Sequence, residues 1–364
     1  MERGARRDGC RERRQASAEA GSAGREPQPA RDVREVFRRQ AEHFEALGSP
    51  VYARLAEHLA DDPEPARGLL GDEQPDFHDP LRLFGAVHSL VLMGVAPDAL
   101  SGDWDDFAAA LADHADAIRH RLAEQDVQTN EVQRCIALLP AFLTIAREVG
   151  LPLELLELGP SAGLNLLVDR YRYRYAAGSW GPESARLELR AEERGGTVPA
   201  DLLATELVVR RRTGIDLAPV DATTDVGYLL LRSFLWPGLE DRVRRLDNAI
   251  ATVRDEAVPP ELIRGDYVEL LPALLAERPH DAATVVFQTA STGYLPPDAA
   301  ALLRASLEAA GADGRPLAWV STRRHDEREG TTEDAYELEL RAWPGPWRLA
   351  ALVDFHGNWL DWRL

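Results

Sequence analysis

Hydrophobic positions recur at helical spacing through the first third of the chain. Across residues 31–150, apolar residues come every three or four positions, in segments that end at Gly or Pro, as at 48–50 and 150–152. That period predicts amphipathic helices, and the same stretch carries little strand signal. We therefore expect a helical domain at 31–150, which would cover a substrate as a lid.

The pattern changes at residue 153 to short apolar runs that alternate with helical segments. The runs at 153–158, 283–288 and 317–321 predict buried strands. Strands that alternate with helices predict a parallel sheet covered by helices on both faces. The last two runs, 337–343 and 349–355, predict a terminal antiparallel hairpin.

Composition narrows the classes of function. The 364 residues carry a formal net charge of −19. An acidic surface argues against a nucleic-acid partner, which requires basic patches. All 42 basic residues are Arg, because the chain contains no Lys. This excludes a Schiff-base lysine and a P-loop lysine.

Cysteine use and hydropathy add further limits. Cys10 and Cys135 give no disulfide framework, and no C-x-x-C, H-E-x-x-H or EF-hand pattern predicts a metal site. No apolar run reaches the roughly 20 residues that cross a bilayer, and residues 1–30 lack the apolar region of a secretory signal. We expect a cytoplasmic protein with no membrane partner and a disordered arm at 1–30.

The most informative motif follows the first predicted strand. The run at 153–158 ends in Glu157 and turns through Gly159, Ser161 and Gly163. Glycine permits a tight turn and close approach of a ligand, and free N–H groups at a new helix end favour a polar or anionic group. Nucleotide-like cofactors bind at this place in α/β proteins. The alternative is a strand–turn–helix that holds no ligand.

The pattern E-x-G-x-S-x-G resembles the first motif of class I S-adenosylmethionine (SAM) methyltransferases. The resemblance continues over 151–364 in the order of the elements. It implies an α/β, Rossmann-like fold with a mostly parallel seven-stranded sheet and an antiparallel C-terminal hairpin. It also implies that Glu157, Gly159, Ser161 and Gly163 contact SAM as the cofactor.

Two later strand ends resemble further motifs of these enzymes. Asp216 resembles the acid that binds the ribose hydroxyls, a role that suits a carboxylate because it accepts both protons. The long segment 167–205 leaves Asp221 as an alternative for that role. Asp266 and Tyr267 resemble the end of the third strand, where the cofactor's adenine amine lies.

The loop after the fourth core strand, at 288–296, resembles the loop that faces cofactor and substrate in methyltransferases. Thr289 and Ser291 are expected to bind the substrate, and Tyr294 to bind or deprotonate it.

The whole chain is also similar to an uncharacterised actinobacterial family with this core. The similarity rests on segments that include 37–40, 128–131, 161–165 and 235–237. In that family the loop after the fourth strand usually carries larger residues, including His and Trp. The smaller residues of this chain therefore suggest a specialised substrate or a changed reaction.

The remaining candidates each have a structural alternative. Gln128, Asn130 and Glu131 precede the first strand, near the expected ligand mouth, where the two amides would bind substrate and Glu131 would be a base. They also suit a helix N-cap. Asp169 and Arg170 either orient an anionic substrate group, with Asp169 as a base, or form a surface ion pair.

Three functions are compatible with these features. The first is SAM-dependent methyl transfer to a small, natural-product-type molecule, in which positioning supplies most of the catalysis. The second keeps the scaffold without SAM. Here an amine displaces a sulfate or phosphate within one molecule, and resemblance to family members linked to natural-product assembly suggests aziridine closure. The third is a non-catalytic partner subunit, because fold alone does not establish function.

Overall fold

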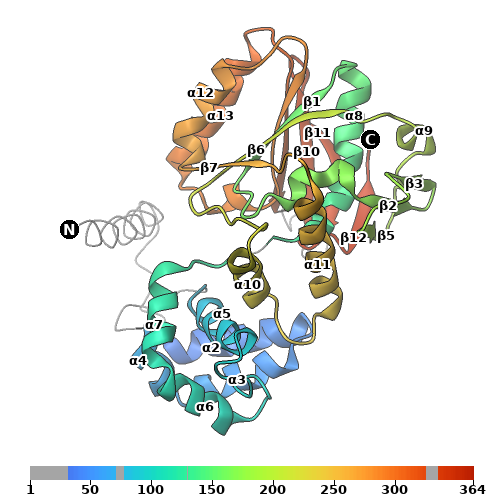
Figure 1. Cartoon of the computed structure of the whole chain (residues 1–364). Coiled ribbons are helices and arrows are strands. Elements are labelled where there is room, and N and C mark those ends of the chain that lie inside the picture. The colour runs from blue at the N-terminus through green and yellow to red at the C-terminus, as the bar shows by residue number, and fades with distance from the viewer. Residues whose placement is uncertain (1–31, 71–77, 129, 325–334) are drawn as a thin grey trace.

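The computed structural model describes residues 32–70, 78–128, 130–324 and 335–364. The arm expected at 1–30 lies outside these residues. Figure 1 shows two lobes, a helical one formed by the first third of the chain and one built around a large sheet. No helix of the described residues is long and apolar enough to cross a membrane.

The helical lobe follows the periodicity of the sequence. Asp32 accepts a hydrogen bond from the backbone N–H of Arg34 and caps the first helix, and Pro50 begins the second. Phe44 packs at the centre, with ring centroids 5.1 Å from Tyr52 and 5.3 Å from Phe84. These buried rings give the lobe a core of its own. Its helices are α2 (Val33–Ala46), α3 (Pro50–Asp61), α4 (Glu64–Leu70), α5 (His78–Leu92), α6 (Trp104–Asp113) and α7 (Ala115–Glu124).

The sheet of the second lobe is mixed, with a parallel centre. Its strands are β1 (Leu153–Leu158), β5 (Glu192–Glu193), β6 (Val209–Asp216), β7 (Glu261–Arg264), β8 (Ala283–Gln288), β9 (Leu317–Arg324), β10 (Ala335–Ala342), β11 (Arg348–Asp354) and β12 (Trp359–Trp362). They lie in the order β5-β12-β11-β10-β9-β8-β1-β6-β7. The strands from β7 to β9 are parallel, and β10, β11 and β12 form an antiparallel meander. The chain leaves β1 to β6 on one side and reaches β8 on the other, so the carboxyl end of β1 is a topological switch point.

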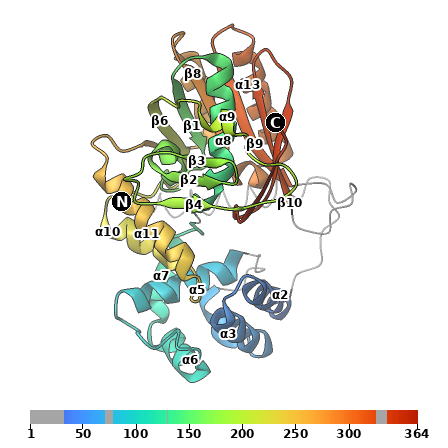
Figure 2. The ribbon, with the colours of Figure 1, turned by 90° about the vertical axis from the view of Figure 1, so that its right-hand side faces the viewer.

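Helices cover both faces of this sheet (Figure 2). Leu155 of β1 joins the core with α8 (Cys135–Val149) and α11 (Glu240–Asp255). The next residue, Leu156, faces α12 (Tyr267–Ala276) and α13 (Pro297–Gly311). This alternation explains why β1 is apolar along its whole length. The helix α8, which ends the segment expected to be a lid, packs on β9, β10 and β11.

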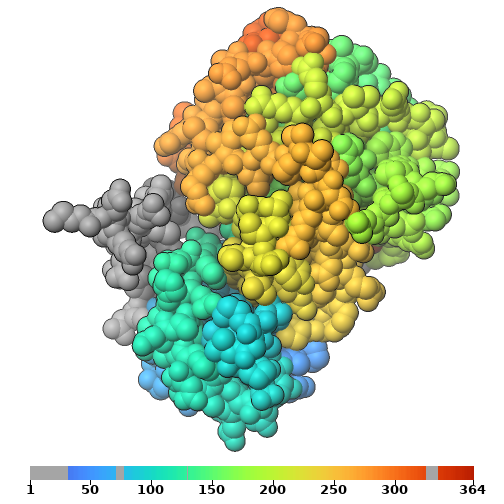
Figure 3. All heavy atoms as spheres, in the orientation of Figure 1, coloured from blue at the N-terminus to red at the C-terminus, as the bar shows by residue number. Residues whose placement is uncertain are grey.

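Two helices connect the lobes. The helix α10 (Asp225–Ser233) packs on α5 of the helical lobe, and α11 follows it toward the sheet. In Figure 3 their yellow and gold surface lies between the blue and teal helical lobe and the rest of the sheet lobe. The two lobes are therefore joined by more than the chain segment at 125–134.

The expectation of an α/β fold with a large, mostly parallel sheet and a terminal hairpin is confirmed, but the expected count of seven strands is wrong. The described residues form a nine-stranded sheet. The additional strands are β12 and the two-residue β5, which pair in parallel through Trp359 and Glu192. Gly196 also accepts a backbone hydrogen bond from Trp362 and donates its own N–H to Asp361 at 2.7 Å.

The long segment after β1 forms a small subdomain. After η2 (Leu164–Arg170) it contains α9 (Ala200–Leu203) and a second sheet of β2 (Arg172–Tyr175), β3 (Gly178–Trp180) and β4 (Glu188–Arg190). Tyr171, Tyr173 and Tyr175 are buried, and each hydroxyl donates a hydrogen bond to a backbone carbonyl 2.6–2.7 Å away. Their role is packing, because no hydroxyl is left to face a ligand.

Candidate functional site

The glycine turn stands at the carboxyl end of β1, as the motif predicts. Gly159, Ser161 and Gly163 all have positive φ, at 70°, 54° and 69°. A left-handed Ser costs on the order of 1 kcal/mol or more, so its conformation must be held by its neighbours. Asp216 holds it, because its carboxylate accepts hydrogen bonds from the N–H groups of Ser161 and Ala218, both at 2.8 Å.

Side chains of the protein cover the turn. Ser291, in η3 (Ser291–Tyr294) after β8, donates a hydrogen bond to the carbonyl of Leu158 at 2.6 Å. It approaches so closely that a Cβ on Gly159 would lie 2.5 Å from the Cβ of Ser291. The close approach that Gly159 permits is therefore made by the chain itself.

The segment before α8 covers the other side of the turn. Gln128 accepts a hydrogen bond from the Ser161 hydroxyl at 2.5 Å, and Asn130 donates one to the carbonyl of Pro160 at 2.6 Å. Gly163 is covered as well, because a Cβ there would lie 2.9 Å from a methyl group of Leu262. Gln128 and Asn130 thus do lie at the motif, but they bind the turn itself.

The acids expected at the cofactor end their strands as the resemblance implies. Both oxygens of Asp216, at the end of β6, bind backbone N–H groups. Asp266, after β7, caps α12 by accepting a hydrogen bond from the Val268 N–H at 2.7 Å. Tyr267 is buried, and burial raises its pKa to about 12. With Ser291, Gln128 and Asn130 over the turn, these residues do not fit SAM unless the loops that carry them move.

Glu157 lies beneath the turn as a buried acid. One oxygen accepts a hydrogen bond from Asn165 at 3.2 Å, and the other has no hydrogen-bond partner among the described residues. Burial raises the pKa of Glu157 to about 8. The group is therefore mostly protonated at pH 7, which avoids the large cost of an unpaired buried charge.

A pocket opens beside the turn, at the carboxyl ends of β8, β9 and β11. Its polar lining residues are Arg134, Thr289, Thr322, Tyr336 and Asp354, and its apolar walls come from α8, β10 and β11. Its cavity volume is about 20 Å³, which is room for a water molecule, so a larger ligand requires the lining to open.

Arg134 is the most distinctive group of this pocket. It ends η1 (Val132–Arg134), donates to the Phe355 carbonyl at 2.9 Å and to the Thr289 hydroxyl at 3.2 Å, and lies 4.2 Å from the centroid of the Phe355 ring. Burial lowers its pKa. Arg134 is not among the residues expected from the sequence, although a charged residue beside the apolar run at 135–146 is an available signal.

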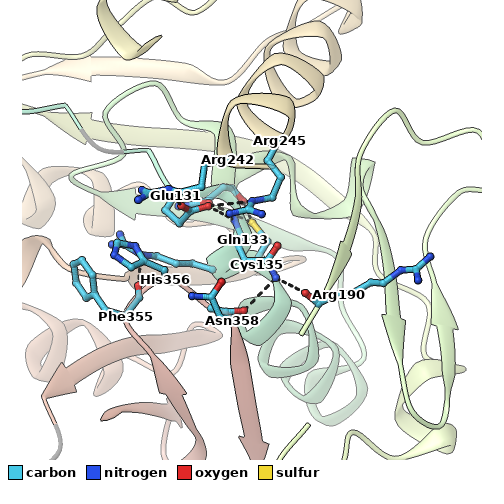
Figure 4. A network of polar contacts seen from close by, with 12 residues as sticks. Glu131, Gln133, Cys135, Arg190, Arg242, Arg245, Phe355, His356 and Asn358 are labelled. Carbon is cyan, nitrogen blue, oxygen red and sulfur yellow. Dashed lines mark hydrogen bonds and ion pairs between the residues drawn. The ribbon is translucent and has the colours of Figure 1, made fainter. Parts of the chain in front are cut away.

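Glu131 is buried next to this pocket within an ionic cluster (Figure 4). One carboxylate oxygen lies 2.7 Å from Nε of Arg242, and the other lies 3.5 Å from Nε of Arg245. The second oxygen also accepts the Gln133 N–H, so Glu131 is the N-cap of η1. Both oxygens of Glu131 are therefore engaged by groups of the protein, which is a structural role.

The other two catalytic candidates lie apart from the pocket. Asp169 binds Arg212 at 2.6 Å and Arg170 at 2.8 Å, and Arg170 also binds Glu256 at 2.7 Å. This ion-pair group does not include any residue of the pocket. The ring of Tyr294 is two-thirds exposed, and its centroid lies 5.8 Å from that of His78 in the helical lobe.

The comparisons with known proteins give a family but no activity. A family model described as "Uncharacterized protein conserved in bacteria (DUF2332)" matches residues 34–362. No curated protein and no solved structure matches the chain. The match begins in the first helix of the helical lobe and ends in β12, so it includes both lobes and the pocket between the sheet and α8.

Proposed function

The chain belongs to this uncharacterised bacterial family, and we propose that it is a small-molecule tailoring enzyme that uses a methyltransferase-like scaffold without SAM. The observation that carries the proposal is the contrast between two neighbouring places. The glycine turn is covered by Ser291, Gln128 and Asn130. The adjacent pocket has a buried cation, Arg134, and an apolar wall.

The reaction that suits this pocket is a nucleophilic displacement within one molecule. An amine nitrogen forms a bond to a neighbouring carbon while the bond from that carbon to a sulfate or phosphate oxygen breaks. The leaving group departs with the electron pair as an anion, and Arg134 faces it as the cation of the pocket. The amine proton passes to solvent water, because the oxygens of Asp354, the carboxylate of the lining, already accept N–H groups of His356, Asn358 and Trp359. Closure of an aziridine is a concrete example.

The test uses 2-aminoethyl hydrogen sulfate as a minimal probe, without SAM. The purified protein is expected to release sulfate and form aziridine, measured by ion chromatography and mass spectrometry. Arg134→Gln should remove most of this activity. Arg348→Gln is the matched control, because Arg348 forms an exposed ion pair with Glu148. Equal release by wild-type protein and Arg134→Gln, or no release by folded wild-type protein, would contradict the proposal.

SAM-dependent methyl transfer is the second candidate, and two observations favour it. The turn has three left-handed residues, and Asp216 and Asp266 follow the ends of β6 and β7. This function requires the contact between Ser291 and Leu158 to open. Calorimetric titration with SAM and S-adenosylhomocysteine decides the matter. Micromolar binding that is lost in Gly163→Trp would favour it over the SAM-free reaction.

A non-catalytic partner subunit is the third proposal. It predicts that the protein alone neither releases sulfate nor binds SAM, and that activity appears only when a second protein is added. Co-purification followed by the same sulfate assay tests this proposal. A cooperative thermal unfolding transition of the protein alone shows that its inactivity is not due to misfolding.

A further inference from the structure

Two further arginines lie near Arg134, beside the pocket. We call this group the arginine cluster, and it consists of Arg242 and Arg245, which contact Glu131 (Figure 4), together with Arg134. Arg242 and Arg245 come from one face of α11, three positions apart, and reach the same carboxylate. The side chains of these two arginines are only 14% and 20% exposed.

The charges of the cluster do not balance. The guanidinium groups of Arg242 and Arg245 contact the carboxylate of Glu131, and Arg134 interacts with it at longer range. Glu157, the next acid that acts on Arg134, is mostly protonated at pH 7. Arg242 lowers the pKa of Arg134, which means that the two cations repel each other. Like charges held together away from water are costly unless an anion joins them.

Arg242 and Arg245 also have N–H groups that are not used in hydrogen bonds. Arg242 and Arg245 approach Glu131 through Nε, but neither Nε makes a hydrogen bond within the described part of the chain. A guanidinium presents five N–H groups in a planar fork, and this fork matches two oxygens of a phosphate or carboxylate. These N–H groups are therefore the natural donors for an anionic ligand.

His356 completes the cluster from the opposite side (Figure 4). Its Nδ1 is buried and has no hydrogen-bond partner among the described residues. Burial and the nearby Arg242 and Arg134 lower its pKa to about 2, so the ring is neutral and keeps one N–H donor. Asp354, which lines the pocket with Arg134, is a further carboxylate near the cluster, and its oxygens accept the backbone N–H groups of His356 and Trp359 and bind Asn358.

From this arrangement we propose that the arginine cluster recognises a phosphomonoester of the ligand. A phosphomonoester carries close to two negative charges at pH 7, which suits a cluster in which arginines outnumber carboxylates. This inference rests on the proposed function as a small-molecule enzyme and names its substrate class: a molecule with a phosphorylated end at α11 and an apolar part toward the pocket. Arg134 borders both places.

The experiment measures binding of inorganic phosphate to the full-length protein by calorimetry, at constant ionic strength. Arg245→Gln is the test variant, because it removes one cation and leaves the 2.7 Å contact between Arg242 and Glu131. Arg244→Gln is the matched control from the same helix, since Arg244 is exposed and pairs with Asp241. Wild-type protein and Arg244→Gln should bind phosphate equally, and Arg245→Gln at least about tenfold more weakly.

A second variant makes the result specific. Glu131→Gln removes the anion that competes for the arginines, so phosphate should bind it more tightly than wild-type protein. Binding of sulfate to the same proteins is measured for comparison. Stronger binding of phosphate than of sulfate would support a phosphomonoester. Equal binding would show that the site accepts any tetrahedral oxyanion and would overturn the choice of phosphate. Equal phosphate binding by wild-type protein, Arg245→Gln and Arg244→Gln would overturn the site.

The two proposals fail in different ways. If Arg245→Gln loses phosphate binding but the wild-type protein releases no sulfate from 2-aminoethyl hydrogen sulfate, the recognition site is supported and the displacement reaction is rejected. Sulfate release that depends on Arg134, together with phosphate binding that is indifferent to Arg245, would keep the reaction and reject the site.

Discussion

The hydroxyl of Ser291 donates a hydrogen bond to the carbonyl oxygen of Leu158 at 2.6 Å, and this bond joins the loop after β8 to the last residue of β1. The two strands flank the switch point of the sheet, where ligands of doubly wound proteins usually enter. In this protein the switch point is closed by a side chain from the loop after the neighbouring strand, and the pocket lies one step further along the sheet, beside Thr289.

Replacing Ser291 with Ala should loosen this closure. We expect a loss of about 1 kcal/mol in the free energy of unfolding, because one hydrogen bond to a buried carbonyl is removed. The measurement is urea unfolding of both proteins. Ser306→Ala is the control, since the exposed Ser306 bonds only to Leu302 within α13, and it should change stability by less than Ser291→Ala. A larger loss in Ser306→Ala would speak against the closure.

Gly159→Ala should be more harmful than the same change at Gly150. Both glycines have nearly the same φ, 70° and 68°, so both variants incur a left-handed Ala, about 1 kcal/mol. The new Cβ at Gly159 would also lie 2.5 Å from that of Ser291, whereas nothing lies within 4 Å at Gly150. Overpacking adds roughly 1–3 kcal/mol. Equal losses of stability in the two variants would refute the close approach.

Glu157 should make stability fall as the pH rises. Its pKa is about 8 in the folded protein, against an ordinary value of 4.5 for the unfolded chain, so between these values the folded protein keeps a proton that the unfolded chain has lost. Its contribution is complete below pH 4.5 and is lost progressively up to pH 8, by as much as about 1.4 kcal/mol per pH unit. Glu157→Gln should lack this slope. Urea unfolding of the wild-type protein and Glu157→Gln at about pH 5.5 and about pH 7.5 gives the change in the free energy of unfolding for each. An equal decrease in both proteins would exclude Glu157 as the cause.

His356 should remain neutral throughout the range in which histidines usually titrate. Burial and the adjacent arginines lower its pKa to about 2, because a positive ring would be both desolvated and repelled. Its ring proton shifts, followed by nuclear magnetic resonance, should not change between about pH 5 and 8. A titration midpoint within that interval would show that the ring faces solvent and does not face the arginine cluster.

The local features of the fold could be predicted from the sequence. The alternation of strands and helices, the turn at Gly159 and Gly163, and the acid that ends β6 at Asp216 are all properties of short segments. The two extra strands could not, because β5 has two residues and β12 has four, too few for a pattern. Hydrophobic periodicity cannot identify strands of that length.

The contacts of the candidate site residues were harder to predict, because the residues that bind one another are distant in the sequence. Glu131 lies beside the pocket, but its partner Arg242 is on a helix more than a hundred residues later. Asp169 and Arg170 are neighbours in the sequence, yet Asp169 also binds Arg212 in the sheet. Ion pairs of this kind depend on packing, and a single sequence does not reveal which charges will meet.

The pairing of β5 with β12 has a consequence for the order of folding. The two strands are far apart in the sequence of the sheet lobe, and the bonds between Gly196 and residues 361–362 form only when the last residues are in place. Closing so long a loop is slow, because its entropy must be lost before the contacts form. During synthesis the sheet's β11 edge thus stays open until β12 (Trp359–Trp362) has left the ribosome, and in this interval the edge is exposed to aggregation.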